Sequence, residues 1–194
     1  LRLYSDAIVT TAVTINTDDP ELTVRIPPCD EYDYVQHPLR VVIDKHLSTC
    51  STAKVYQQDV GKAILITSSI ALNSSENAAK IHDFTNKGVK IHDVPLDQNN
   101  LSVSHIWQLL AALDCNDVLV EAGAGFNGYL LSRETLVDEW IVYQSGLVMG
   151  TTAKGMFDIP DPEYGNSMTN LFKLKCKHIK QIADNWCIIL GSNE

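Results

Sequence analysis

The sequence predicts an α/β protein with a mixed sheet that is mostly parallel and ends in an antiparallel hairpin. Between residues 62 and 135, strand-like apolar segments alternate three times with helix-like segments. Such alternation implies parallel strands with helices packed on the faces of the sheet. Residues 171–180 and 185–190 then resemble two neighbouring antiparallel strands. No linker marks a second domain, so we expect one domain over residues 1–194, long enough to bury its own core.

The first third of the chain contains one clear strand. Residues 6–10 form a short apolar run, and residues 17–28 predict a turn followed by extended chain. Residues 29–38 are polar and follow two prolines, which is typical of a surface loop. The β-branched run at residues 39–44 predicts a strand that ends at a charge.

The middle and end of the chain supply the remaining elements. We predict helices where a capping residue precedes an amphipathic segment and strands where β-branched residues cluster. The predicted strands are residues 62–69, 89–96, 117–122 and 138–146, and the predicted helices are residues 75–88, 102–115 and 125–135.

Charge and composition exclude several classes of protein. The net charge of −9, from 24 acidic and 15 basic residues, does not favour nucleic acid as a partner. No stretch approaches the ~20 apolar residues that span a bilayer, and the first residues do not resemble a signal peptide. The five cysteines and six histidines show no metal-ligand spacing. We therefore expect a cytoplasmic protein with no metal site and no membrane partner.

A glycine-rich segment, VEAGAGFNGYLL at residues 120–131, contains G-x-G-x-x-G at Gly123, Gly125 and Gly128. A Rossmann fingerprint lies in the first strand–turn–helix unit and is followed ~20 residues later by an acid that ends the next strand. Here the motif comes late in the chain, and the acids Asp138 and Glu139 stand at the start of the next predicted strand rather than at its end. The segment still joins a strand to a helix N-terminus. It therefore predicts either an anion-binding loop or merely a tight turn.

Charged residues at strand ends and at a turn are further candidates. Glu121 ends a predicted strand, where ligands of α/β sheets gather, although an acid there also suits the dipole of the next helix. Asp18 and Arg25 flank a proline turn, which predicts either a solvated cap or an arginine that binds phosphate. Lys45 follows the strand at residues 39–44 and is either a 2′-phosphate ligand or an ordinary surface residue.

Four segments in order resemble one family. They are SDAIVTTAVTINTDDPELTVR (5–25), PLRVVIDKHL (38–47), NDVLVEAGAGFNGYLLSRETLVDEWIVYQSGLVMG (116–150) and AKGMF (153–157). Together they resemble the reductase domain of the bacterial bifunctional riboflavin-biosynthesis deaminase/reductase. The resemblance implies a dihydrofolate-reductase-like, three-layer fold. It also implies NADPH-dependent reduction of 5-amino-6-(5-phosphoribosylamino)uracil to the ribitylamino compound, by a protein that is a dimer or other homo-oligomer.

The resemblance also implies site residues, position by position. The substrate would contact Arg2, Leu22, Arg25 and Glu121, with the arginines suited to the ribose phosphate. The cofactor would contact Thr14, Asp18, Lys45, Gly123, Ala124, Gly125, Phe126, Asn127, Gly128 and Tyr129. Glu121 and Asp18 are the candidates for proton transfer, and water on the substrate is the alternative.

The sequence departs from the family pattern in three places. Lys45 stands where family members commonly have serine, and the glycine that often precedes Thr14 is absent. The family's opening strand, part of a helix and the zinc-binding deaminase domain are not within these 194 residues, so we expect part of the active site to be missing. Two other functions stay open: another reductase of the same superfamily, or a truncated, non-catalytic domain for dimerisation or ligand binding.

Overall fold

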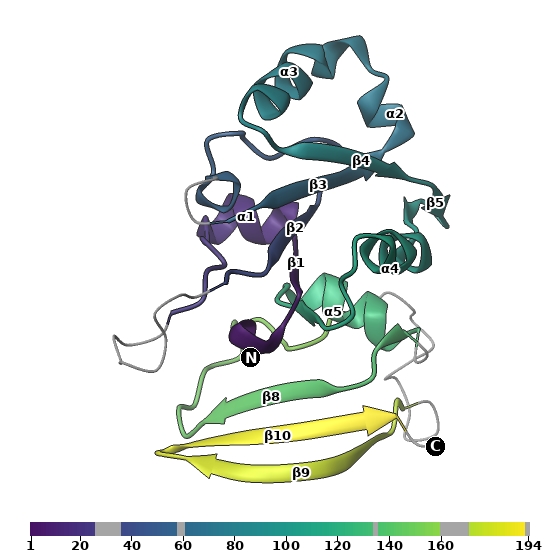
Figure 1. Ribbon diagram of the computed structural model, residues 1–194. Coiled ribbons are helices and arrows are strands. Elements are labelled where there is room, and N and C mark those ends of the chain that lie inside the picture. Colours follow the sequence, from purple (N-terminus) through teal and green to yellow (C-terminus); the bar gives the residue numbers. More distant parts are fainter. Residues whose placement is uncertain (26–35, 58–60, 134–135, 160–170, 193–194) are drawn as a thin grey trace. The chain divides into compact units, whose positions relative to one another are not determined.

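The computed structural model describes residues 1–25, 36–57, 61–133, 136–159 and 171–192. The chain divides into two compact units, Leu1–Ala122 and Gly123–Glu194. Each unit has its own sheet, and Figure 1 labels the elements of both. The expectation of a single reductase domain over residues 1–194 stays a prediction.

The first unit is built on a five-stranded sheet in the order β4-β3-β2-β1-β7. Every neighbouring pair in it is parallel, as the alternation of strands and helices predicts. The strands are β1 (Ala7–Thr11), β2 (Leu39–Ile43), β3 (Ala63–Ser68), β4 (Lys90–Val94) and β7 (Val118–Val120). The edge strands are therefore β4 and β7, at opposite sides of the sheet.

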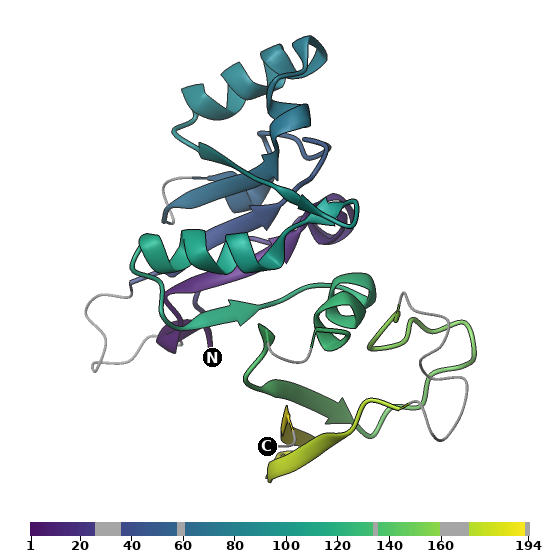
Figure 2. The ribbon, with the colours of Figure 1, turned by 90° about the vertical axis from the view of Figure 1, so that its right-hand side faces the viewer.

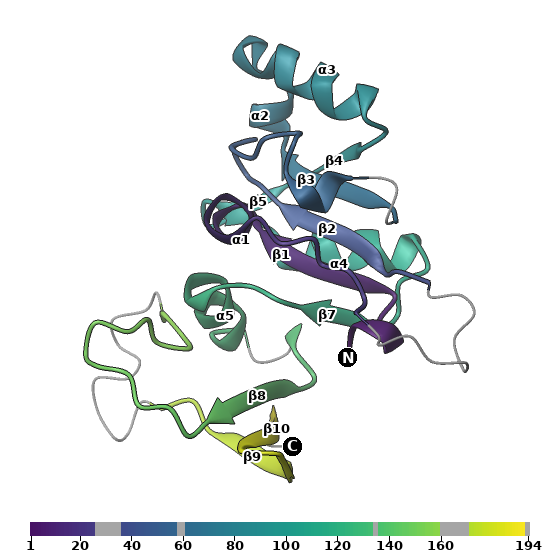
Figure 3. The same ribbon diagram turned by 90° about the vertical axis from the view of Figure 1, so that its left-hand side faces the viewer.

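Helices cover both faces of this sheet, which gives the first unit three layers. The helical elements of the unit are η1 (Arg2–Tyr4), α1 (Ala12–Asp18), η2 (Lys54–Tyr56), α2 (Ser69–Leu72), η4 (Ser75–Asn77), α3 (Ala78–Asn86) and α4 (Val103–Ala112). Ile15 of α1 and Phe84 of α3 pack in one buried cluster with Ile8. Ile106 of α4 packs in a second cluster with Val9. Figure 3 shows α1 and α4 on opposite faces of the sheet.

The sequence pattern missed several short elements of the first unit. Helices α1 and α2 follow β1 and β3 directly, and a two-stranded hairpin, β5 (Leu96–Asp97) and β6 (Asn100–Leu101), follows β4. The hairpin turns at Gln98 and Asn99, which both have positive φ, as a tight hairpin of this kind requires. Figure 2 shows β4 and α4, which the hairpin connects, from the side.

The second unit combines one helix with an antiparallel sheet. Helix α5 (Ala124–Leu131) is followed by β8 (Trp140–Ser145), β9 (Leu174–Ile182) and β10 (Asn185–Ser192). The strand order is β8-β10-β9, and both pairs are antiparallel. The predicted C-terminal hairpin is therefore confirmed, with β8 as a third strand. None of the described helices combines the length and apolar character that a membrane crossing requires.

Candidate active site

Arg2 and Glu121 form a bidentate ion pair in the first unit. Arg2 Nε donates to Glu121 Oε1 at 2.7 Å, and Arg2 Nη2 donates to Oε2 at 2.7 Å. A planar guanidinium matches a carboxylate in this geometry, and such paired bonds are among the strongest in proteins. The hydrogen bond to Glu121 is the main reason that the pKa of Arg2 is raised. Both carboxylate oxygens of Glu121 thus accept hydrogen bonds from Arg2.

Glu121 lies where parallel strands of the sheet end. It follows β7, and its main-chain N–H donates to the carbonyl of Val9 in the central strand β1 at 2.9 Å. Arg2 Nη1 donates to the main-chain carbonyl of Thr23 at 2.7 Å. Three segments far apart in the sequence thus meet at the carboxyl side of the sheet, where ligands of α/β proteins bind.

The two predicted substrate residues beside Thr23 differ in exposure. Arg25 is exposed, so its guanidinium is open to an anion. Leu22 is only 2% exposed and packs in the core with Ile8 and Ile15. A residue this buried offers a substrate almost no surface, so the contact of Leu22 with the substrate stays a prediction.

Helix α1 carries two of the predicted cofactor residues. Thr14 and Asp18 are four positions apart, so they share one face of the helix. Thr14 is half-buried, with its hydroxyl 3.4 Å from that of Thr11, and Asp18 is exposed. The neighbouring Asp19 has the capping role: it ends α1 with φ 42° and accepts the main-chain N–H of Lys54 at 2.9 Å.

Lys45 lies just beyond the carboxyl end of β2. Its ammonium group donates to the main-chain carbonyl of Asn99 and, at 3.1 Å, to Asn99 Oδ1. Its main-chain carbonyl accepts the hydroxyl of Ser68 at 2.9 Å, which ties it to the end of β3. The hairpin thus holds a lysine beside the ends of β2 and β3, and its role as a phosphate ligand stays a prediction.

In the second unit, the glycine segment forms the start of α5. Among the described residues, no side chain caps the helix at Gly123, and the first-turn N–H groups of a helix lack partners within the helix itself. A Cβ atom at Gly123 or Gly125 would meet nothing within 4 Å, so packing does not demand glycine there. An uncapped helix N-terminus with open glycines fits the phosphates of a dinucleotide.

Gly128 has a different role from the other two glycines. A Cβ atom at Gly128 would lie 2.0 Å from the main-chain oxygen of Asp158, and Gly128 is buried. The Asp158 N–H donates to the carbonyl of Ala124 at 2.9 Å, so the two segments are in close contact. Packing requires this glycine, and its contact with a cofactor stays a prediction, as it does for the half-buried Phe126, Asn127 and Tyr129.

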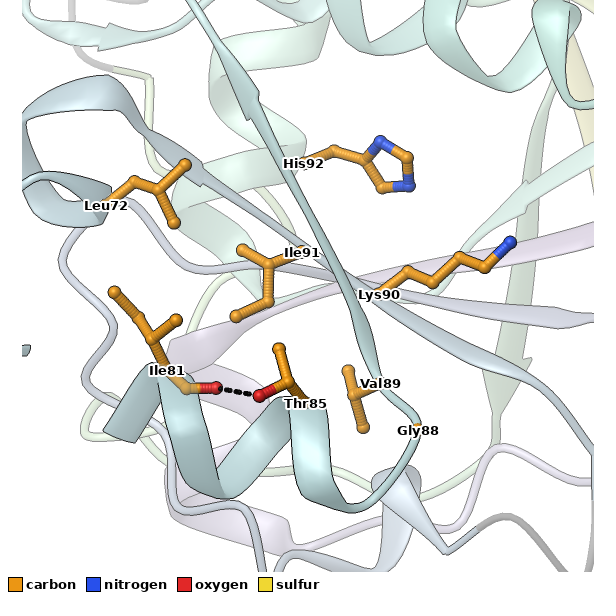
Figure 4. A pocket seen from close by; sticks show the side chains of 8 residues that line it. All are labelled: Leu72, Ile81, Thr85, Gly88, Val89, Lys90, Ile91 and His92. Atoms are coloured by element: carbon orange, nitrogen blue, oxygen red, sulfur yellow. Dashed lines mark hydrogen bonds between the residues drawn. The ribbon is translucent and has the colours of Figure 1, made fainter. Parts of the chain in front are cut away.

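An open pocket of about 530 Å³ lies elsewhere in the first unit. In Figure 4, Leu72, Ile81 and Ile91 gather on one side of β4, and Lys90 and His92 point away from them. This pocket is at the edge of the sheet opposite β7 and contains none of the predicted site residues. Within the described ranges, His, Cys, Asp and Glu do not form a group of three that could hold a metal ion.

Comparison with known proteins identifies the family. The family described as the RibD C-terminal domain matches residues 1–188. The chain belongs to this family. The RibD riboflavin-biosynthesis protein of Chlamydia muridarum is 32% identical over 80% of this chain and 39% of its own length. The 5-amino-6-(5-phosphoribosylamino)uracil reductase of Buchnera aphidicola is 27% identical over 98% of this chain and 88% of its own length.

A solved structure supports the same fold. Acinetobacter baumannii RibD superposes with a TM-score of 0.77 at 24% identity, covering the whole of this chain and 48% of that one. The dihydrofolate-reductase-like fold predicted from the resemblance is thus confirmed. The chain spans about half or less of the length of several RibD relatives that it matches.

The sequence did not reveal which residues hold the site residues in place. Thr23 and Asn99 act through main-chain carbonyls, which carry no sequence signal. His37, whose ring accepts the main-chain N–H of Val24, is not in any motif. Only the general pattern of polar residues beside predicted strands and turns could have indicated Thr23, Asn99 and His37.

Proposed function

We propose that the chain is an NADPH-dependent 5-amino-6-(5-phosphoribosylamino)uracil reductase of riboflavin biosynthesis. The observation that carries the proposal is the network joining Arg2, Glu121 and the Thr23 carbonyl. It assembles predicted substrate residues at the sheet edge where α/β proteins bind ligands. Membership of the RibD C-terminal domain family and the name of the Buchnera relative support the same reaction.

Glu121 would bind the substrate as an acceptor. Because both of its oxygens accept hydrogen bonds from Arg2, it is suited to receive further bonds from ribose hydroxyl groups or an amine. When bound, NADPH supplies the hydride for the imine-like C1′ carbon of the ring-opened sugar. The nitrogen or sugar oxygen must be protonated, and the exposed Asp18 or water on the substrate suits this role better than the paired Glu121.

Arg25 would bind the substrate phosphate. All three nitrogens of the Arg2 guanidinium donate to Glu121 or to Thr23, whereas Arg25 is exposed. Phosphate is the anion for which a guanidinium fork is best suited. This assignment narrows the sequence-based expectation that both arginines serve the phosphate.

The proposed cofactor contacts are assigned within each unit separately. In the second unit, we assign the phosphates of the dinucleotide to the Gly123–Tyr129 segment, where no described side chain caps the helix N-terminus. In the first unit, Thr14 and Asp18 on one face of α1 would contact the cofactor, and Lys45 would contact its 2′-phosphate. That last contact makes NADPH the preferred cofactor over NADH.

A kinetic assay tests the function directly. The protein is mixed with the phosphoribosylaminouracil and NADPH, and cofactor oxidation is followed alongside formation of the ribitylamino product. We expect Arg25→Ala to raise KM for the substrate roughly tenfold or more, with little effect on KM for NADPH. Equal effects on both constants would remove the phosphate role from Arg25.

The assay also separates the two alternative functions. Another reductase of the superfamily would oxidise NADPH with a non-phosphorylated pterin- or pyrimidine-like substrate and would not depend on Arg25. A non-catalytic domain would bind NADPH without turning over either substrate. Membership of the RibD C-terminal domain family and the name of the Buchnera relative favour the phosphoribosylaminouracil reductase.

We further propose that the protein associates with a second copy of itself through the sheet of the second unit. Cross-strand pairing places Trp186, Ile188 and Ile179 on one face of that sheet, where Trp186 is 46% and Ile179 is 55% exposed. Large exposed apolar patches mark interaction surfaces. Light scattering after gel filtration should show a dimer that Trp186→Glu dissociates, and an unchanged mass would refute this interface.

A further inference from the structure

The segment that carries the proposed phosphate ligand has a strained backbone. Leu22 has φ 55° in the left-handed region, which L-residues other than glycine, asparagine and aspartate rarely adopt. Its side chain is nevertheless 2% exposed and packed in the core. Strain of this kind persists only where surrounding contacts hold it, and such positions cluster at functional sites.

Three side chains from other parts of the chain hold the segment on either side of Leu22. Arg2 Nη1 donates to the Thr23 carbonyl at 2.7 Å, and Arg40 Nη1 approaches the Glu21 carbonyl at 3.5 Å. His37 Nδ1 accepts the Val24 main-chain N–H at 3.1 Å. The bond to His37 involves the residue directly before Arg25, so it has the most immediate effect on where that arginine lies.

The ring of His37 is itself in a fixed place. The residue directly precedes the buried Pro38 and β2, and it is half-buried. A Cβ atom at Gly61 would lie 3.2 Å from His37 Cβ, so the Gly61 main chain packs against it. Because Nδ1 accepts a hydrogen bond, the ring must be neutral, with its proton on Nε2.

We propose that His37 is a positioning residue for substrate binding: its neutral imidazole holds Val24 and thereby places Arg25 for the phosphate of the substrate. This inference rests on the proposed function. His37 acts through Val24 and Arg25 and does not itself touch the substrate. A side chain with an acceptor in the same place can replace it, and asparagine is that side chain, because its Oδ1 is bonded to Cγ as Nδ1 is. An apolar side chain cannot replace it.

Kinetics of His37→Leu and His37→Asn, at a pH of about 8 where imidazole is neutral, test the proposal. Loss of one hydrogen bond corresponds to roughly a tenfold change. We therefore expect His37→Leu to raise KM for the phosphoribosylaminouracil about tenfold while kcat and KM for NADPH change less than about twofold. His37→Asn should keep the wild-type KM. The matched control is His82→Leu, which removes an exposed histidine from α3.

Hydrogen exchange of the Val24 amide gives a readout that does not depend on turnover. We expect exchange to be about tenfold faster in His37→Leu than in the wild type, and unchanged in His37→Asn. Thermal melts of each variant confirm that it is folded. Equal Val24 exchange in wild type and His37→Leu, or a KM in His37→Asn as high as in His37→Leu, would overturn the positioning role.

The two hypotheses fail in different ways. A wild-type protein without turnover refutes the proposed function, while Val24 exchange still decides whether His37 holds the segment. A wild-type protein with normal turnover whose KM is unaffected by His37→Leu refutes the positioning role and leaves the reductase function standing.

Discussion

At the scale of single residues, the sequence predicts candidates better than it predicts their partners. Glu121 was predicted because it ends an apolar segment before glycines, and the structure places it at the end of β7. Its partner Arg2 is 119 positions away, so no local pattern connects the two. His37 was missed for the same reason, because its partner is a main-chain N–H thirteen residues earlier.

The Arg2–Glu121 pair gives a prediction about both stability and binding. Glu121→Gln leaves the Arg2 guanidinium without its anion, so we expect a loss of about 1–3 kcal/mol in unfolding free energy. Substrate KM should also rise about tenfold, because one charged acceptor is lost. Urea denaturation and steady-state kinetics measure the two effects.

The control for Glu121→Gln is Glu139→Gln, which breaks the exposed Lys177–Glu139 pair at 3.3 Å. An exposed pair contributes little, so this variant should stay within about 0.5 kcal/mol of wild type. Equal effects of the two substitutions would show that the Arg2–Glu121 pair has no special role.

At the scale of secondary-structure elements, the prediction succeeded where patterns are long and failed where tertiary contacts decide. Helix α1 has the sequence AVTINTD, in which β-branched residues disfavour a helix. Burial of Ile15 in the core overrides that preference. The β5–β6 hairpin was missed because positive φ falls on Gln98 and Asn99 rather than on a glycine.

Two substitutions in helix α5 separate the packing role of Gly128 from the proposed phosphate-binding role of Gly125. Gly128→Ala would place Cβ against the Asp158 main chain, and we expect a loss of about 2–4 kcal/mol in stability, comparable to a severe overpacking change. Gly125→Val meets no protein atom, so it should leave stability nearly unchanged but weaken NADPH binding by blocking the approach of the phosphates. Chemical denaturation and NADPH titration of both variants test this division. Normal NADPH affinity in Gly125→Val would refute the role of the loop.

The link between β1 and β7 predicts a dependence on pH. Asp6 Oδ2 accepts the N–H groups of Asp117 and Asn116 at 2.9 and 2.8 Å, and these bonds hold the pKa of Asp6 below its ordinary value of 3.8. A lowered pKa in the folded state contributes stability above the unfolded pKa, and the contribution is lost as pH falls through the folded pKa.

We therefore expect Asp6→Asn to be less stable than wild type at neutral pH. The stability difference between the two proteins should shrink as the pH falls below 3.8, the ordinary pKa of an aspartate. Urea midpoints measured from about pH 7 down to about pH 3 show the convergence. Asp83→Asn, on an exposed position of α3, is the control. A constant difference between Asp6→Asn and wild type across the series would contradict this account.

At the scale of the whole molecule, the α/β class and the parallel order could be predicted because alternating strands and helices leave few ways to bury both faces of a sheet. The terminal β9–β10 pair was predicted from two adjacent strand-like segments. The site was harder to predict, since it gathers residues from η1, the segment after α1, and the ends of β2 and β7. Contacts between segments so far apart depend on the completed fold.

Cofactor preference should be visible in the stability of the whole protein. A ligand that binds only the folded state at 100 times its Kd adds about 2.7 kcal/mol, which for a chain of this size raises Tm by roughly 5–10 °C. We expect NADPH to give a shift of this size and NADH, at the same concentration, a smaller one, because Lys45 at the end of β2 would bind the 2′-phosphate.

Lys45→Ala should reduce the Tm shift caused by NADPH to that caused by NADH. Lys90→Ala, at the start of edge strand β4, removes the same charge and should leave the difference intact. Equal shifts for NADPH and NADH in the wild-type protein would remove Lys45 from the cofactor site.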